Sequence, residues 1–198
     1  MTERGTRGRR AASLALVLGA LATSCSSMQP AAPADLALDF EAAAELLDFR
    51  VTDEAMWRVG EGSLELLGKS AYDPPHRSPH SIALLRTPDL GDFVLEVDLM
   101  QTGREYGHRD LCLFFGHQDA ANFYYVHLAT TPDPNAHNVF VVDDADRRPL
   151  APVPETGVDW GTGIWHRVRL ERTGAHISVH FDGDLVHEVE DGTHGAGR

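Results

Sequence analysis

Two observations on the 198-residue sequence predict an all-β fold, an antiparallel β-sandwich. The first is a succession of short segments of about five to eight residues, rich in β-branched and aromatic side chains and separated by turn residues. The second is an alternation of apolar and polar positions within several of these segments, which is typical of strands with one buried face.

The predicted strands follow an N-terminal segment, DFEAAAELLDF at residues 39–49, whose apolar spacing is that of a helix. Turn sequences such as GEGS, TGA and DGD separate the strands. The expected strands are residues 56–59, 64–67, 81–87, 93–101, 110–116, 123–130, 138–144, 164–172, 176–181 and 185–190.

Alternation also predicts which faces are buried. In FVLEVDLM the apolar residues Phe93, Leu95, Val97 and Leu99 share one face of the strand. LCLFF is apolar on both faces, so we expect it near the middle of a sheet, with Cys112 as a small buried apolar residue.

The first 24 residues have the features of a secretory signal. Four arginines precede an apolar run, SLALVLGALA, that is too short to span a bilayer as a lasting helix. The run leads into ATSCSS and is similar to a bacterial lipoprotein signal, in which Cys25 becomes the lipidated first residue. Ordinary cleavage nearby, with Cys25 unmodified, is the alternative.

This reading divides the chain into a signal peptide at residues 1–24, a lipidated cysteine with a flexible tether at 25–37, and the β-sandwich domain at 38–198. Ser26 follows the cysteine, and the lack of Asp there favours the outer membrane or cell surface over retention in an inner membrane. We therefore expect a protein of the bacterial cell envelope whose contact with the membrane is through a lipid anchor only.

Charge excludes one class of partner. The whole chain has a formal net charge of −13, and removal of residues 1–24 leaves 13 basic and 29 acidic residues, or −16. Nucleic acid is a poor partner for such a domain. Once Cys25 is assigned to the lipid, Cys112 is the one remaining cysteine, so we expect no disulfide within the domain.

Four motifs occur in a familiar order: WRVGEGSLEL from Trp57, LRTPDLGDFVLEV from Leu85, FYYVHL from Phe123, and WHRVRLER with ISVHFDG at residues 165–183. Together they resemble the concanavalin A-like lectin/glucanase superfamily, and within it most closely the 3-keto-disaccharide hydrolase family. The resemblance implies a jelly roll of two curved sheets with a carbohydrate site on the concave face.

The sequence departs from that family in two places. Related chains usually continue beyond the final DGTHGAGR, so either the last strands are missing here or another segment covers the exposed sheet edge. Hydrolase-like members also tend to have a Glu and a Gln two residues apart where this chain has Tyr125 and His127, which weakens any catalytic role carried over from that motif.

Two other kinds of site find little support. EVDLMQ, from Glu96 to Gln101, is similar to the catalytic strand of laminarinase-like glucanases, but Gln101 cannot donate the proton that the final Glu supplies. The eleven histidines, all of which lie after residue 24, lack an HExxH motif or a short converging set. We therefore predict no metal and no cofactor.

The candidate site lies around the two strands at residues 110–116 and 123–130. Tyr125 and His127 share a face that combines aromatic and hydrogen-bonding groups, which is the chemistry that sugars require. We expect further contributions from the ends of neighbouring strands, by His108, Arg109, Asp110, His137 and Asn138. The alternative is that the tyrosine and histidine only pack inside the fold.

Two functions follow from this site. The first is a glycoside hydrolase of the 3-keto-disaccharide type, with His127 and Asp110 as an acid–base pair. The second is a non-catalytic glycan-binding or surface-interaction domain. The missing Glu/Gln pair favours the binding domain, whereas the clustered His, Arg and Asp favour the enzyme; in both cases the expected partner is a carbohydrate.

Overall fold

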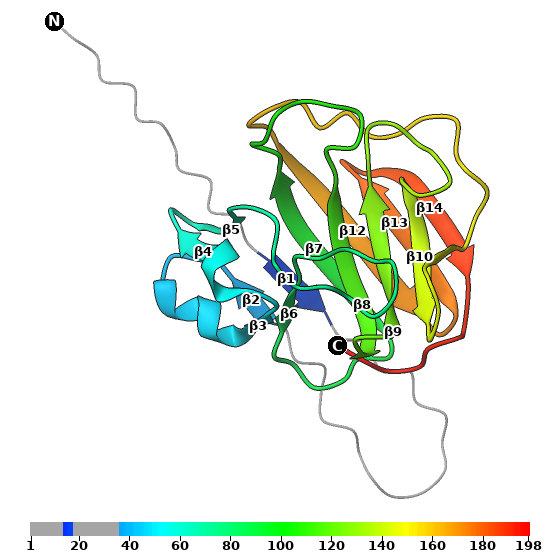
Figure 1. Ribbon diagram of the computed structural model, residues 1–198, viewed down its shortest axis with the longest axis horizontal. Helices are drawn as coiled ribbons and strands as arrows, with labels where there is room; N and C mark the ends of the chain where they lie inside the picture. The colour runs from blue at the N-terminus through cyan, green and yellow to red at the C-terminus, as the bar shows by residue number, and fades with distance from the viewer. Residues whose placement is uncertain (1–13, 18–35) are drawn as a thin grey trace, which may run out of the picture.

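The computed structural model describes residues 14–17 and 36–198. Its strands form two main antiparallel sheets packed face to face (Figure 1). The order is β14-β13-β12-β7-β1-β2 in the six-stranded sheet and β11-β10-β9-β8 in the four-stranded sheet. The predicted fold class, an all-β antiparallel sandwich, is confirmed.

The strand bounds show how each sheet is assembled. The six-stranded sheet contains β1 (Leu14–Val17), β2 (Leu36–Leu38), β7 (Phe93–Met100), β12 (Trp165–Thr173), β13 (His176–Phe181) and β14 (Asp184–Glu190). The four-stranded sheet contains β8 (Leu111–Asp119), β9 (Asn122–Leu128), β10 (Asn138–Asp143) and β11 (Arg148–Pro149). Two small pairs stand beside them: β3 (Phe49–Val51) with β6 (Ala83–Leu85), and β4 (Trp57–Gly60) with β5 (Ser63–Leu66).

The main core lies between the two large sheets. As the alternation predicts, Phe93 of β7 is buried there, and Leu95, Val97 and Leu99 pack against the same cluster. The four-stranded sheet contributes alternate residues of β9 and β10, namely Tyr124, Val126, Leu128, Val139 and Val141. Side chains one position along therefore point to the opposite, outer face of that sheet.

Two hairpins end in the tight turns that the sequence indicated. Glu61 and Gly62 have φ values of 54° and 73°, and Asp182 and Gly183 have values of 52° and 94°. Two successive positive φ angles are the mark of a type I′ turn, whose twist matches that of the flanking strands.

The predicted helix at residues 39–49 is only partly present. Ala43–Asp48 form a short 3-10 helix, η1, and a second one, η2, covers Glu54–Met56. Leu46 packs against a small core cluster, but Leu47 is 76% exposed. With a single packed leucine, this segment lacks the apolar stripe that stabilises a longer α-helix.

Strand β1 lies within the segment predicted to be a signal peptide. It pairs with both β7 and β2, so cleavage before Cys25 would remove the strand that lies between these two. Cys25 and tether residues 26–35 lie outside the described residues, so the anchor remains a prediction, whereas Leu36 and Ala37 of the predicted tether belong to β2. The described part of the chain has no helix long and apolar enough to cross a membrane.

The segment after β14 runs back across the end of the sandwich. The backbone of Arg198 exchanges two hydrogen bonds with His117, at 2.7 and 3.0 Å. Gly197 pairs with Leu90, and the buried Arg172 guanidinium donates to the carbonyl oxygens of His194 and Gly195. The C-terminal residues thus connect β8 of one sheet to the loop before β7 of the other.

Candidate functional site

A cavity of about 520 Å³ lies over the outer face of the four-stranded sheet. One wall is the loop between β5 and β6, which contributes residues 77–80 and runs across β8 and β9 (Figure 1). The loop is held there by two contacts: the Arg77 backbone N–H donates to the Asp146 carboxylate at 2.8 Å, and the Arg147 N–H donates to the Arg77 carbonyl at 3.3 Å. We call this cavity the outer pocket.

The other walls come from the strands and their ends. Asp110 and Cys112 lie at the start of β8, and His108 lies just before it. His127 comes from β9, Asp133 and Asn135 from the turn after it, and Arg147 from the segment after β10. Burial is the main cause of a strongly raised pKa of the Cys112 thiol, which is therefore not a thiolate nucleophile.

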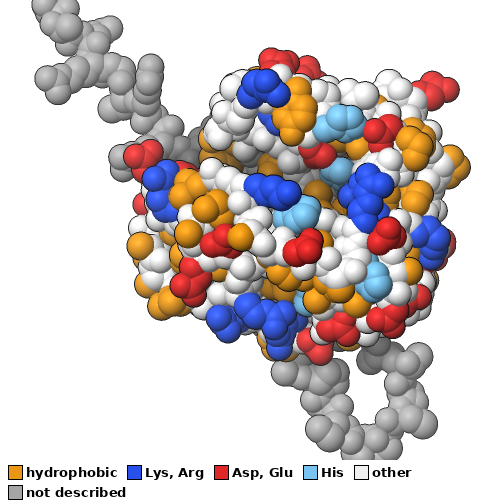
Figure 2. Space-filling model, in the orientation of Figure 1, with side chains coloured by type: hydrophobic (Ala, Val, Ile, Leu, Met, Phe, Trp, Pro, Cys, Tyr) orange, Lys and Arg blue, Asp and Glu red, His pale blue; other side chains and the backbone are white. Residues whose placement is uncertain are grey.

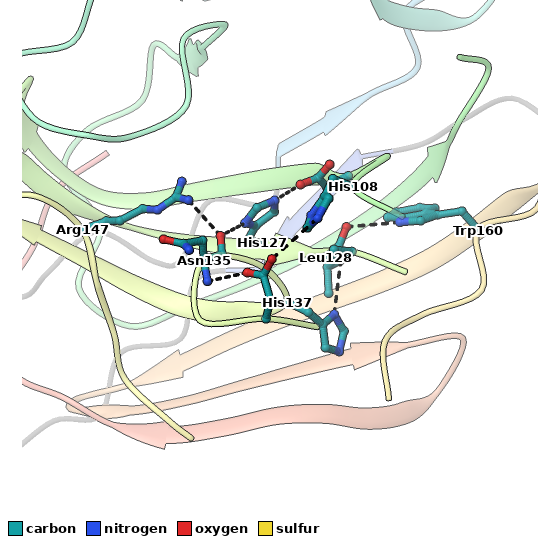
Figure 3. Close-up of polar contacts among 10 residues, drawn as sticks. His108, His127, Leu128, Asn135, His137, Arg147 and Trp160 are labelled. Carbon is teal, nitrogen blue, oxygen red and sulfur yellow. Dashed lines mark hydrogen bonds and ion pairs between the residues drawn. The ribbon is translucent and has the colours of Figure 1, made fainter. Parts of the chain in front are cut away.

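His127 has a hydrogen-bonding partner at each of its two ring nitrogens. Its Nε2 forms a hydrogen bond with the Asp110 carboxylate, and its Nδ1 lies 3.1 Å from the Asn135 carbonyl oxygen (Figure 3). Both partners are oxygens of the protein, so both ring nitrogens of His127 are engaged within the fold. The His127 and Asp110 side chains are only 10% and 16% exposed.

His108 and Asp133 form the accessible rim. The His108 Nε2 is 3.6 Å from the Asp133 carboxylate, and the His108 side chain is 53% exposed. Asp133 also accepts a 2.6 Å hydrogen bond from the Asn135 backbone N–H, which shapes the turn after β9. These two side chains are therefore available to a ligand.

Arg147 forms the back of the pocket. Its Nη2 donates to the Asn135 carbonyl oxygen at 2.9 Å, so that Arg147 and His127 converge on the same acceptor (Figure 3). The guanidinium lies over the Phe140 ring, 5.3 Å from its centre, which is a cation–π contact. Its Nε is buried without a hydrogen-bond partner among the described residues.

The aromatic residues expected to stack on sugars are fully covered. Tyr125 is 0% exposed and stacks between Phe140 and Phe114, with ring centres 5.2 and 5.6 Å away. Burial raises the pKa of its hydroxyl, which has no hydrogen-bond partner among the described residues. Tyr125 shares a face with His127 as predicted, but it forms the floor beneath the pocket and offers no stacking surface.

Three of the predicted site residues lie elsewhere. The buried Arg109 guanidinium donates to Gly103, Gly161 and Thr162, and so joins two loops. Asn138 is buried on the outer face, where its side-chain Nδ2 donates to the Ala151 carbonyl oxygen and its Oδ1 accepts from the Ala151 N–H. These contacts of Arg109 and Asn138 are made within the fold, and their expected roles in binding stay predictions.

His137 is the third predicted site residue that lies outside the outer pocket. It points away from His127 toward the six-stranded sheet (Figure 3), where its ring centre is 4.5 Å from that of His187. Both rings are buried, and burial lowers the pKa of His137 to about 4 and that of His187 to about 3. This neutral pair belongs to the interior and not to the outer pocket.

The EVDLMQ strand carries ion pairs. Glu96 and Asp98 lie on the outer face of the six-stranded sheet, where Asp98 binds Arg167 and Glu96 lies 3.1 Å from Arg169. Gln101 is buried. This is a solvated face with paired charges, and within the described residues no group of three or more His, Cys, Asp or Glu side chains is arranged to hold a metal ion.

The fold and site together define an antiparallel β-sandwich with a polar pocket on the outer face of one sheet. Among solved structures, the chain is similar to a carbohydrate-binding module, CBM66, from Bacillus subtilis, with a TM-score of 0.52 and 16% identity over 76% of this chain and 83% of that one. At this identity the likeness shows the fold alone. No family model and no curated protein matches the sequence.

Proposed function

We propose that this protein is a non-catalytic glycan-binding domain and that the outer pocket is its binding site. The observation that carries the proposal is the polar pocket whose central histidine has both ring nitrogens occupied. The similar fold of a carbohydrate-binding module adds support.

The pocket has the size and chemistry of a sugar site. Its volume of about 520 Å³ falls within the roughly 300–1,000 Å³ typical of small-ligand pockets. The pocket lining presents donors on His108, Arg77 and Arg147, and acceptors on Asp133. Sugar hydroxyls need this mixture, because each can both donate and accept.

The hydrolase alternative, of the 3-keto-disaccharide type, has weaker support. His127 and Asp110 are in contact, as an acid–base pair would be. A general base, however, needs a free lone pair directed at the substrate. Both ring nitrogens of His127 lie against protein oxygens, so His127 would first have to give up its contact with Asp110 or with Asn135.

We also propose a place for the protein in the bacterial cell envelope, tethered by a lipid on Cys25. The sequence features of residues 1–25 support this, with Ser26 favouring the outer membrane or cell surface. Mass spectrometry of the protein from the membrane fraction of a bacterial host tests it. A thioether-linked lipid on an N-terminal Cys25 is expected, and an unmodified N-terminus elsewhere would contradict it.

The function is tested by calorimetry of the full chain against a panel of oligosaccharides, with chromatography of the same mixtures to detect cleavage. We expect saturable binding without products. His108→Ala should weaken binding, whereas His176→Ala should not; both histidines are exposed and face a carboxylate, but His176 pairs with Glu188 at 3.1 Å on the other sheet. Released product would establish the hydrolase, and equal losses in the two variants would place the site elsewhere.

A further inference from the structure

Two arginines line the outer pocket without an acidic partner. Five of the twelve arginines that the structure describes form ion pairs with carboxylates, Arg167 and Arg169 among them. Arg77 and Arg147, in contrast, form no ion pair with any described residue. Two uncompensated guanidinium groups in one cavity of an acidic protein point to an anionic ligand.

The position of Arg147 is fixed before any ligand arrives. The Asn135 carbonyl and the Phe140 ring hold its guanidinium, yet its Nε remains without an acceptor. A buried donor without a partner is unfavourable in the free protein, so it gains from any ligand oxygen that reaches it. Arg77 lies on the loop that forms the opposite wall and is exposed.

The two carboxylates of the pocket are each engaged by a histidine and form no ion pair with either arginine. Asp110 forms a hydrogen bond with the His127 ring. Asp133 faces His108 at 3.6 Å. The lining as a whole has two arginines and three histidines against these two carboxylates. Figure 2 shows basic and histidine side chains gathered around a hollow on this face, with acidic side chains between them.

The pocket also lacks the feature that neutral sugars use most. The rings of Tyr125 and Phe140 are fully buried beneath it, so no tyrosine, phenylalanine or tryptophan face is open for stacking. Ligand recognition must then come from charge and hydrogen bonds.

From these observations we propose that the outer pocket takes an acidic glycan, whose carboxylate or sulfate group binds between Arg77 and Arg147. The inference rests on the proposed glycan-binding function and specifies its ligand class. Both groups present planar or tripodal oxygens that a guanidinium binds with two parallel hydrogen bonds.

Calorimetry of the full chain tests the proposal with matched pairs of ligands. One pair is oligogalacturonate and its carboxyl-reduced counterpart, and the other is a sulfated oligosaccharide and its desulfated form. We expect at least one acidic member to bind about tenfold or more tightly than its neutral partner, and we expect that binding to weaken as salt is raised. The pair that shows the difference identifies the anion.

Variants locate the effect. Arg77→Gln and Arg147→Gln should each weaken acidic-ligand binding about ten- to a hundredfold, the range for loss of a charged hydrogen bond, with little effect on a neutral ligand. Arg148→Gln is the control, because Arg148 is the neighbouring arginine but lies outside the pocket and near Asp191. If Arg147→Gln fails to fold, Arg77→Gln alone tests the proposal, because Arg77 is exposed.

Three results would overturn the inference, and they differ from one another. Equal binding of neutral and acidic partners, unaffected by Arg77→Gln, would refute the acidic-ligand class and leave glycan binding standing. No binding by either class would refute the glycan-binding function itself. An equal loss in Arg148→Gln would show that overall charge, and not the pocket, attracts the ligand.

Discussion

Replacing His187 with leucine should make the protein less sensitive to acid. His187 on β14 is buried beside His137, and its Nε2 has no hydrogen-bond partner among the described residues. Burial lowers its pKa to about 3, whereas in the unfolded chain the pKa is about 6.5. Between these two values the unfolded chain binds more protons than the folded protein. The free energy of unfolding therefore falls as the pH falls through this window.

The size of the effect follows from the two buried histidines. A pH of 5 lies about 1.5 units below the pKa that each histidine has in the unfolded chain. At about 1.36 kcal/mol per unit, each histidine therefore lowers the free energy of unfolding by roughly 2 kcal/mol. The native protein should thus lose roughly 4 kcal/mol between pH 7 and pH 5 from this pair. His187→Leu should lose roughly 2 kcal/mol less over the same interval, because only His137 still titrates.

Urea unfolding at pH 7 and pH 5 measures this difference. His176→Leu is the matched control, since His176 is exposed and should leave the pH dependence close to that of the native protein. The reasoning would be refuted by an equal change in the free energy of unfolding between the two pH values for the native protein and His187→Leu.

Three further predictions concern contacts that position the pocket and close the fold. Asp110→Asn should lower the free energy of unfolding by about 1.5–3 kcal/mol, because the buried His127 ring loses its hydrogen bond to a carboxylate; urea unfolding checks it, and no change would mean that the pair is not formed in solution. Gly157→Ala should lower the melting temperature, since its Cβ would lie 2.3 Å from the carbonyl oxygens of Ala129 and Thr130; Gly103→Ala, with nothing within 4 Å of the added Cβ, is the control, and equal melting of both variants would argue against this packing. Tyr124→Phe should speed amide exchange after β14, because the tyrosine hydroxyl accepts from the His194 N–H at 3.0 Å and donates to Asp191 at 2.5 Å; unchanged exchange there would contradict this role.

Most of the sandwich could be predicted from periodicity. The alternation in β7 identified the buried face, because a strand places successive side chains on opposite faces whatever lies around it. The helix at residues 39–49 was over-predicted, since Phe40 adopts a positive φ of 57° and Leu47 faces solvent. Periodicity alone does not reveal a segment that packs through only one or two residues.

The site was predicted only where strands determine it. His127 and Asp110 meet because β8 and β9 are antiparallel neighbours, with Cys112 opposite His127 in the ladder. Arg77, Asn135 and Arg147 were missed because they come from loops, whose paths depend on contacts such as that between Arg77 and Asp146. The prolines and histidines of residues 69–81 did indicate a stiff loop that could lie over this face.

His137 shows a different limit of the sequence. In the ladder Asn138 stands opposite His127 on the outer face, so His137, one residue earlier, is turned to the interior. Proximity in sequence to Asn138 suggested a shared site, whereas His137 precedes β10 with a positive φ of 56° and its side chain lies apart from that of Asn138. The engagement of both His127 ring nitrogens, which favours binding over catalysis, depends on two contacts that no sequence pattern identifies.

Glycan binding in the outer pocket is tested most directly by titrating the isotope-labelled protein with oligosaccharides and following backbone amide shifts by NMR. The account predicts saturable shifts concentrated at residues 77–80, His108, Asp110, His127, Asn135 and Arg147. Shifts confined to the Glu96 and Asp98 face of the six-stranded sheet, or no shifts with any acidic or neutral glycan, would contradict it.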